Sequence, residues 1–225
     1  NTLALAPSPI GVSRARYAFA EINLPLVSAR QQVPRVVGLS FNGAMRREDY
    51  GDDDFGSVST PKVGVLWSVT PALDVRASWG KSFKAPTLNV QQSPRAAALL
   101  PAVIFGGAPG AAVLTQQGGN PDLGPERAEV LTAGLLFRPA FLPGARFELG
   151  AFRIDYTDRA AVPINPLSQA ISNPVYADFV SLNPSAAEQS ALIAGSDLFF
   201  NSSGAPYNPA NVIAIVRNGT INIAR

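Results

Sequence analysis

Apolar and polar residues alternate with a period of two in several stretches of the chain. In LDVRASWGKSF (Leu73–Phe83), the odd positions hold Leu, Val, Ala, Trp, Lys and Phe, whereas the even positions hold Asp, Arg, Ser, Gly and Ser. Because successive side chains of a strand point to opposite sides, this alternation predicts a strand with one apolar and one polar face. The same pattern predicts further strands at Arg14–Leu26, Val36–Arg46, Pro61–Val69, Glu126–Arg138 and Ala145–Tyr156.

The last predicted strand changes phase in its middle. Two of its large apolar residues fall on one face, Phe147 and Leu149, and three on the other, Phe152, Ile154 and Tyr156. A β-bulge near Ala151 would bring all five onto one side of the sheet. Without a bulge, aromatic side chains would project from the polar face, and the pattern leaves both alternatives open.

The links between the predicted strands alternate in length. Short links lie at Val27–Pro34, Thr70–Ala72 and Pro139–Gly144, and long ones at Arg47–Thr60, Lys84–Pro125 and from Thr157 to about Thr220. Antiparallel strands with short turns at one end and long loops at the other are typical of outer-membrane barrels. A soluble sandwich is the alternative, but loops of this length count against it. On the barrel interpretation, Trp67, Trp79 and Phe83 belong to aromatic girdles at the membrane interfaces.

One segment of the last long link predicts a short helix. In NPSAAEQSALIAG (Asn183–Gly195), Asn183 is a candidate N-cap, Ser185 and Glu188 match a capping box, and Gly195 ends the pattern. We expect this helix to be a packing element of the loop rather than a lid.

The composition narrows the possible functions. Only 15% of the 225 residues are charged although 47% are hydrophobic, and no apolar run reaches the length of a membrane-spanning helix. The net charge of +2 is spread along the chain, so nucleic acid is not an expected partner. The chain holds no His and no Cys, which excludes catalysis by imidazole or thiolate and metal binding through these side chains. We expect neither a cofactor nor an enzyme.

Five motifs in sequence resemble the barrel region of TonB-dependent outer-membrane receptors. They are FAEINLPLV (Phe19–Val27), DYGDDDFGSVSTPKVGVLW (Asp49–Trp67), VTPALDVRASWGKSFKAPTL (Val69–Leu88), NPDLGPER (Asn120–Arg127) and FRIDYTDR (Phe152–Arg159). The resemblance implies an all-β fold, an incomplete antiparallel transmembrane β-barrel with long extracellular loops and one short loop helix. Six strands cannot close a barrel of about 22 strands, so residues 1–225 are interpreted as a fragment that lacks the plug domain and the C-terminal strands.

The resemblance also implies a function for the parent receptor. Such receptors bind a scarce ligand, for example a ferric siderophore, cobalamin or an oligosaccharide, and import it across the outer membrane of a Gram-negative bacterium. The implied partners are outer-membrane lipid and lipopolysaccharide, a small-molecule ligand such as a metal chelate, and the TonB complex, through a missing N-terminal region. A passive porin-like barrel or a surface adhesin is the alternative, and a soluble β-protein with a carboxylate pair such as Asp49 and Glu148 is a third.

Two sets of residues are candidates for the site. The NPDLGPER motif would end the extracellular loop and lead into a strand, an architectural role assigned to Asn120, Pro121, Asp122, Leu123, Pro125, Glu126 and Arg127. Arg and Tyr bind anionic and ring-bearing ligands well, and Gln offers hydrogen bonds. The candidate ligand contacts in loops are therefore Arg46, Arg47, Tyr50, Arg95, Gln116, Gln117, Tyr176 and Tyr207.

Two motifs that suggest ion or nucleotide chemistry are set aside. Gly80-Lys81-Ser82 imitates a phosphate-binding loop but lies within a predicted strand. GDDDFG (Gly51–Gly56) holds three consecutive carboxylates, yet Lys62 stands where a calcium loop needs glutamate. We interpret GDDDFG as a solvated loop, with a loosely held divalent cation as the alternative.

Overall fold

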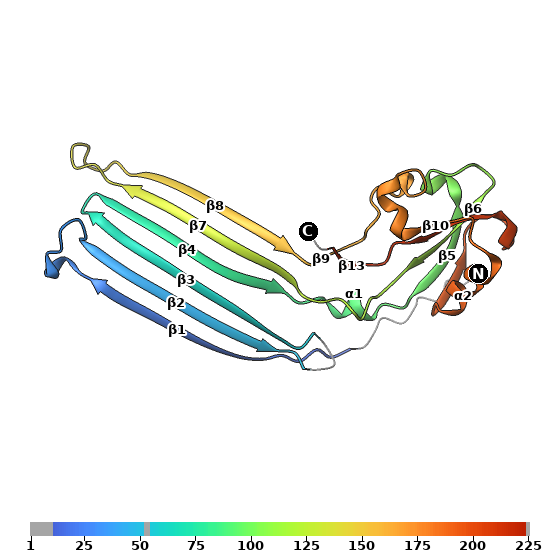
Figure 1. Ribbon diagram of the computed structural model, residues 1–225, viewed down its shortest axis with the longest axis horizontal. Helices are drawn as coiled ribbons and strands as arrows, with labels where there is room; N and C mark the ends of the chain where they lie inside the picture. Colours follow the sequence, from blue (N-terminus) through green and yellow to red (C-terminus); the bar gives the residue numbers. More distant parts are fainter. Residues whose placement is uncertain (1–10, 52–54, 224–225) are drawn as a thin grey trace. The chain divides into compact units, whose positions relative to one another are not determined.

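The computed structural model in Figure 1 describes residues 11–51 and 55–223. Contacts between Cα atoms divide the chain into two compact units. Of the described residues, the sheet unit holds 13–51, 55–85 and 125–158, and the loop unit holds 11–12, 86–124 and 159–223. Each unit is described by itself.

The sheet unit is one antiparallel sheet of six long strands in the order β1-β2-β3-β4-β7-β8 (Figure 1). The strands are β1 (Arg16–Val27), β2 (Gly38–Asp49), β3 (Ser57–Thr70), β4 (Leu73–Lys84), β7 (Glu126–Phe137) and β8 (Phe147–Thr157), with the 3-10 turn η1 (Ala29–Gln31) after β1. All six match the predicted strands. The sheet does not close on itself, because its two edge strands, β1 and β8, do not pair with each other in the described part of the chain.

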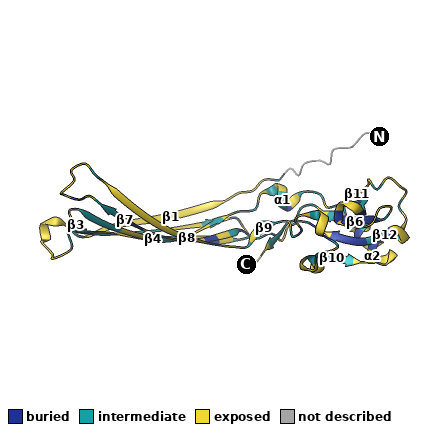
Figure 2. Ribbon diagram, turned by 90° about the horizontal axis from the view of Figure 1, so that it is seen from above, coloured by how far each residue is buried: buried dark blue, intermediate teal, exposed yellow. Residues whose placement is uncertain are grey.

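Cross-strand pairing places the predicted apolar positions on one face, which we call the apolar face. Paired residues share a face, so Phe41 on β2 joins Val65 on β3 and Ala77 on β4. Large apolar side chains on this face are widely exposed. Figure 2 shows mostly exposed and intermediate residues along the strands of the sheet. Examples are Ile22, Leu24, Met45, Val63, Val65, Trp67, Leu131, Leu135, Phe147 and Leu149. A soluble protein does not normally expose so large an apolar surface.

The opposite face, the polar face, carries pairs of oppositely charged side chains. Arg138 bonds to Asp74, which also accepts a hydrogen bond from Ser68 at 2.6 Å. Glu148 bonds to Arg76 and lies 3.1 Å from an Arg146 nitrogen. Polar side chains of this kind suit the lumen of a barrel.

The structure decides one alternative that the sequence left open and corrects one prediction about the sheet. The pairing of β7 with β8 runs from Arg127↔Thr157 to Phe137↔Phe147 without a shift, so there is no bulge near Ala151. Phe152 therefore shares the polar face with Thr132 and is 77% exposed. The link between β2 and β3 is short, because these strands pair as far as Asp49↔Ser57.

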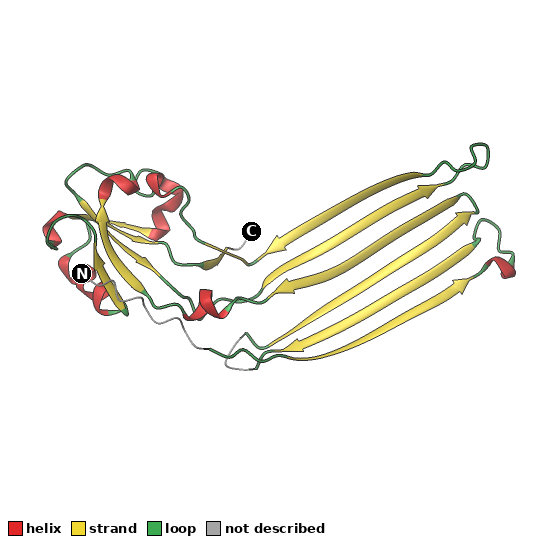
Figure 3. Ribbon diagram, turned by 180° about the vertical axis from the view of Figure 1, so that it is seen from behind, coloured by secondary structure: helices red, strands yellow, loops and turns green. Residues whose placement is uncertain are grey.

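The loop unit folds around a second sheet, in the order β10-β12-β6-β5-β11. Its strands are β5 (Ala96–Pro101), β6 (Ala112–Gln117), β10 (Val180–Leu182), β11 (Leu198–Asn201) and β12 (Val212–Arg217); β9 (Arg159–Ala161) pairs separately with β13 (Ile221–Ile223). Figure 3 shows helical segments around this sheet: α1 (Leu88–Gln92), α2 (Ala186–Ala194), η2 (Ala102–Phe105), η3 (Leu167–Gln169), η4 (Pro174–Phe179) and η5 (Pro209–Asn211). The sequence pattern did not predict the five strands of this second sheet.

The loop unit has its own hydrophobic core on both sides of β6. Leu114 packs with Leu99 and Ile215, while Val113 packs with Phe105 and Val216. All six side chains are nearly or fully buried, and β6 and β12 accordingly form the dark centre of this unit in Figure 2. Because β5 and β6 come from one long loop and β12 from another, the two loops share one core and fold together.

Helix α2 forms where the capping pattern predicts a helix. The Ser185 hydroxyl accepts a hydrogen bond from the Glu188 N–H at 3.2 Å, and the Glu188 carboxylate accepts one from the Ser185 N–H at 2.8 Å. Ser185 rather than Asn183 is the N-cap, since Asn183 lies before the helix with a φ of 49°. Gly195 ends the helix as predicted.

No helix in the described part of the chain has the length and hydrophobicity needed to span a membrane.

Candidate functional site

The start of β5 and the ends of β6 and β12 lie together at one end of the sheet of the loop unit. Ala96 at the start of β5 pairs with Gln117 at the end of β6, so Arg95 lies just beyond this pair. On the other side of β6, Gln116 pairs in parallel with Arg217, the last residue of β12. Pairing therefore gathers two arginines and two glutamines that are distant in sequence.

These residues line a cavity of about 330 Å³. Its wall includes Arg95, Gln116, Gln117, Asn120, Pro121 and Asp122, which the sequence analysis named, together with Pro163, Phe179, Arg217, Thr220 and Ile221. The volume falls at the lower end of the range for small-molecule sites. The structure thus brings three candidate ligand contacts and the first three residues of the NPDLGPER motif into one cavity.

Two glycines permit the close approach that shapes the cavity. A Cβ on Gly118 would lie 2.5 Å from the Pro94 carbonyl oxygen and 2.6 Å from the Arg95 Cα, and its φ of 137° is disfavoured for other residues. A Cβ on Gly119 would lie 2.6 Å from the Ser93 nitrogen. Only glycine lets the end of β6 pass so near the segment before β5.

The NPDLGPER motif is held by hydrogen bonds within the loop unit. The Asn120 side chain accepts one from the Asp122 N–H at 3.0 Å and donates one to the Thr220 carbonyl at 3.1 Å. Leu123 is 2% exposed, and its N–H donates to the Asn120 carbonyl. These contacts agree with an architectural role for this half of the motif.

The second half of the motif begins strand β7. Pro125 is buried, and the Glu126 carboxylate lies 2.9 Å from the Lys84 ammonium. Arg127 lies 3.9 Å from Asp158. Glu126 and Arg127 thus lead into a strand, as the sequence predicts.

Two asparagine side chains beside the cavity bind the backbone of segments distant in sequence. Asn218 is 8% exposed, and its side chain accepts from the Ile164 N–H at 2.9 Å and donates to the Ile164 carbonyl at 3.3 Å. Asn222 makes the same pair of bonds with Gly124, at 2.8 and 3.1 Å. Each side-chain amide takes the place of a backbone hydrogen-bonding partner and holds the segment beside the cavity in position.

The cavity has positive electrostatic character. Arg95 and Arg217 are exposed, and within the described ranges neither guanidinium forms an ion pair with a carboxylate. Arg217 donates one hydrogen bond, to the Ser181 hydroxyl at 3.0 Å. Asp122 is the one acidic side chain in the described wall. Two planar cations against one carboxylate favour an anionic or carbonyl-rich ligand.

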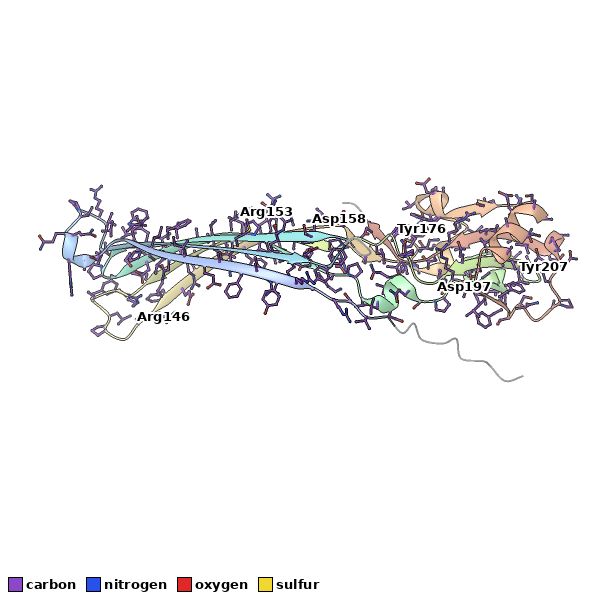
Figure 4. All side chains as sticks on the ribbon, turned by 90° about the horizontal axis from the view of Figure 1, so that it is seen from below. Arg146, Arg153, Asp158, Tyr176, Asp197 and Tyr207 are labelled. Atoms are coloured by element: carbon purple, nitrogen blue, oxygen red, sulfur yellow. The ribbon has the colours of Figure 1, made fainter. Side chains whose placement is uncertain are left out.

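The two tyrosine candidates of the loop unit serve its interior instead. Tyr207 packs on the core, and its hydroxyl donates to the Gln189 side chain at 3.0 Å. Burial raises the pKa of Tyr207. Tyr176 packs on the other part of the core and donates to the Asn165 carbonyl at 2.7 Å. Figure 4 labels both residues. Both hydroxyls donate to other groups of the protein. Neither tyrosine lines the cavity.

The remaining candidates belong to the sheet unit. Arg46 and Arg47 lie on strand β2 rather than in a loop. The Arg46 guanidinium lies 2.7 Å from Glu48 and over the Tyr17 ring, and Arg47 donates to Ser57 at 2.8 Å. Tyr50 donates to Glu48 at 3.1 Å. Ligand contact by these three residues stays a prediction.

The two motifs that suggest ion or nucleotide chemistry can be placed in part. Among them, no group of three or more acidic side chains is placed to hold a metal ion. Of GDDDFG, Asp52–Asp54 lie outside the described residues. Gly80-Lys81-Ser82 is within β4, where no phosphate-binding loop forms.

Sequence reasoning missed one wall residue that matters. Arg217 follows an apolar run, VIAIV, within the last long link. The run is a short strand with a polar residue directly after it, and this signal could have marked the strand end.

Comparisons with known proteins agree with this fold. The family model described as TonB dependent receptor-like, beta-barrel, matches residues 3–204. The siderophore receptor PirA from Pseudomonas aeruginosa superposes with a TM-score of 0.53 at 17% identity, covering 94% of this chain and 29% of that chain. A variant of the ferric enterobactin receptor PfeA from the same organism gives 0.56 at 17% identity, covering 94% and 22%.

A third solved structure has a similar likeness to the chain. The siderophore receptor PirA from Acinetobacter baumannii gives a TM-score of 0.50 at 15% identity, covering 93% of this chain and 24% of that chain. No curated protein matches the chain. The chain therefore spans less than a third of each of these receptors, and the likeness shows a shared fold.

Proposed function

The chain belongs to the β-barrel family of TonB-dependent receptors, and on this premise we propose that it forms part of an outer-membrane active-transport receptor for a ferric siderophore. In this proposal the sheet unit is a segment of the barrel wall in a Gram-negative outer membrane, and the loop unit binds the ligand on the extracellular side. Two of the similar structures are described as siderophore receptors and one as a ferric enterobactin receptor, which supports this ligand class over cobalamin or an oligosaccharide.

The observation that carries the proposal is the cavity at the strand ends of the loop unit. Its wall combines Arg95 and Arg217 with the amides of Gln116 and Gln117. Ferric chelates built from catecholate, hydroxamate or carboxylate groups present oxygen atoms, and many carry a net negative charge. Guanidinium groups bind such oxygens with charge-assisted hydrogen bonds, and primary amides add neutral donors.

The mechanism requires binding and movement but no covalent chemistry. Ligand bound in the cavity would contact both long loops at once, since Gln116 comes from the first and Arg217 from the second. Release toward the barrel interior would then depend on energy from the TonB complex, which acts in this proposal through a region outside these 225 residues.

Uptake in living cells tests the proposal. The natural, full-length protein is expressed in cells that lack the receptor gene. The accumulation of radioactive iron, supplied as ferric enterobactin, is then measured. We expect accumulation that depends both on the protein and on an intact TonB complex. Uptake that continues without TonB, together with large single-channel conductance, would instead identify a passive pore. Binding to cells without uptake would identify an adhesin.

A further inference from the structure

Charges of both signs line the cavity of the loop unit without neutralising each other. Arg95, Arg217 and Asp122 all belong to its wall. Within the described ranges, no ion pair joins Asp122 to either arginine. Because opposite charges that are not paired with each other remain available, a ligand can use all three groups.

Hydrogen bonds fix the backbone that carries Asp122 and Arg95. The Asp122 N–H donates to the Asn120 side chain at 3.0 Å, and the Asn120 N–H donates to the Val90 carbonyl at 3.0 Å. The Arg95 N–H donates to the carboxylate of Asp197, which Figure 4 labels, at 2.8 Å. The Arg95 carbonyl in turn accepts a hydrogen bond from the Asp197 N–H at 2.8 Å. Neither backbone segment can move toward the other without breaking these bonds.

Arg217 is held by other contacts of the loop unit. It is the last residue of β12, and the next N–H, that of Asn218, donates to the Gln116 carbonyl at 3.0 Å. The Arg217 guanidinium donates to the Ser181 hydroxyl on β10 at 3.0 Å. This bond uses one of its five donors and leaves the others for a ligand.

The turn at the start of the NPDLGPER motif does not use the Asp122 carboxylate. Asp122 takes part in the turn through its backbone N–H, and its side chain is exposed. In the described part of the chain, the carboxylate accepts no hydrogen bond from another residue. The charge of Asp122 is therefore available for recognition, whereas the architecture depends on Asn120 and on the buried Leu123.

The size of the cavity limits which part of a ligand it can enclose. Its 330 Å³ has room for about ten water-sized groups, at about 30 Å³ each. A complete hexadentate ferric chelate is several times larger. The cavity consequently encloses one arm of such a ligand, and its charges act on that arm.

An arm that suits this wall carries both signs of charge. Guanidinium groups bind anionic or carbonyl oxygens, and a carboxylate binds a protonated amine, in each case through charge-assisted hydrogen bonds. A chelate whose charged groups are all oxyanions would place negative charge against Asp122, and juxtaposed like charges disfavour binding. The wall thus distinguishes ligands by the presence of a cationic group.

We propose that the cavity selects ferric siderophores with an arm that carries a protonated amine beside anionic or carbonyl oxygens, and that Asp122 makes this selection. In the bound state Asp122 accepts hydrogen bonds from the ammonium, and Arg95 and Arg217 donate to the oxygens. This inference rests on the siderophore function proposed above and specifies the ligand class of the same cavity.

The test compares two ferric chelates that differ only at the amine. The natural, full-length protein in detergent micelles is titrated with a linear ferric trihydroxamate that ends in a free amine, protonated at neutral pH. The second ligand is the same chelate after acetylation of that amine. Asp122→Asn removes the charge and keeps the size of the side chain. Asp178→Asn is the control, since Asp178 is an exposed carboxylate of the loop unit, one position before the wall residue Phe179 but outside the wall.

We expect wild type to bind the amine form about tenfold more tightly than the acetylated form, because acetylation removes a charge-assisted hydrogen bond. Asp122→Asn should bind the amine form about tenfold more weakly than wild type does and the acetylated form equally well, so the preference disappears. Asp178→Asn should keep the preference. Asp122→Glu, which retains the carboxylate, should keep most of it.

Three results would overturn the proposal. Wild type that binds the two chelates equally would show that the amine is not recognised. A preference that persists in Asp122→Asn would place the amine at another group. Equal losses for both chelates in Asp122→Asn, together with a lower midpoint of thermal unfolding, would show that the carboxylate supports the fold instead.

Ferric enterobactin, titrated on the same samples, separates this inference from the siderophore proposal. Binding of ferric enterobactin, with either no binding of the trihydroxamates or no preference between them, would reject selection by Asp122 alone. If wild type binds none of the three ferric chelates, the siderophore proposal is rejected and this inference with it.

Discussion

Gln116 on β6 and Arg217 on β12 lie side by side as a parallel pair, although 100 residues separate them. The pair exists because two long loops share one sheet. A glutamine amide and a guanidinium consequently face the same cavity, and neither loop could form this wall alone. This arrangement motivates the predictions that follow.

Replacing the cavity arginines should weaken ligand binding. We expect Arg95→Gln and Arg217→Gln each to reduce affinity for ferric enterobactin by about 10- to 100-fold, because each removes charge-assisted hydrogen bonds of about 1.5–3 kcal/mol. Isothermal titration measures this. Arg159→Gln is the matched control, since Arg159 is an exposed arginine of the loop unit outside the cavity. An equal loss in the control would mean that the effect is general electrostatic attraction.

Substitution of Gly118 should distort the cavity. In Gly118→Ala the new methyl group meets the backbone of Pro94 and Arg95, and the φ of 137° is disfavoured as well. We expect the free energy of unfolding to fall by about 2 kcal/mol or more. Gly110→Ala is the control, because Gly110 also has a positive φ but no atom within 4 Å of the new Cβ. Gly110→Ala should lower the free energy of unfolding by about 1 kcal/mol. Denaturant unfolding that gives equal costs would show that the close approach is unimportant.

Removing the Asn218 amide should loosen the second long loop, since Asn218 and Ile164 both belong to it. Asn218→Ala leaves the Ile164 N–H and carbonyl without partners at a buried position. We expect a loss of about 2–4 kcal/mol and faster hydrogen exchange at Ile164. Asn222→Ala makes the matching change at Gly124, so exchange should rise there and not at Ile164. Exchange at Ile164 that is unchanged in Asn218→Ala would contradict the role assigned to this amide.

The start of α2 should depend on pH. Hydrogen bonds from the backbone and hydroxyl of Ser185 lower the pKa of Glu188 below its ordinary value. The stabilisation is therefore present above the unfolded-state pKa and is lost as the pH falls through the lower, folded-state value. We expect increasing exchange in the peptide 183–195 between about pH 5 and about pH 2, after correction for the intrinsic rate.

A variant controls the pH experiment. Glu188→Gln keeps a side chain that can accept the hydrogen bonds but does not titrate. It should show no such rise. A rise of the same size in this variant would assign the effect to another group.

The sequence by itself determined the long strands and, except for β8, their faces. Alternation at Leu73–Phe83 and its counterparts depends only on which side of the sheet each residue faces, which is a local property of a strand. The capping box at Ser185 and Glu188 was readable for the same reason, because both partners lie within one turn. The motif NPDLGPER likewise revealed its turn and the start of β7, since proline restricts the backbone locally.

Only the tertiary structure decided the site. Tyr207 and Arg95 look equally able to bind a ligand in the sequence, yet the fold turns Tyr207 to the core and leaves Arg95 at the cavity. The register of β7 with β8 placed Phe152 on the polar face without the bulge that its sequence phase suggested. Parallel pairing of β6 with β12 brought Arg217 to Gln116. Contacts between distant segments decide such choices through packing, and no local pattern in either segment records its partner.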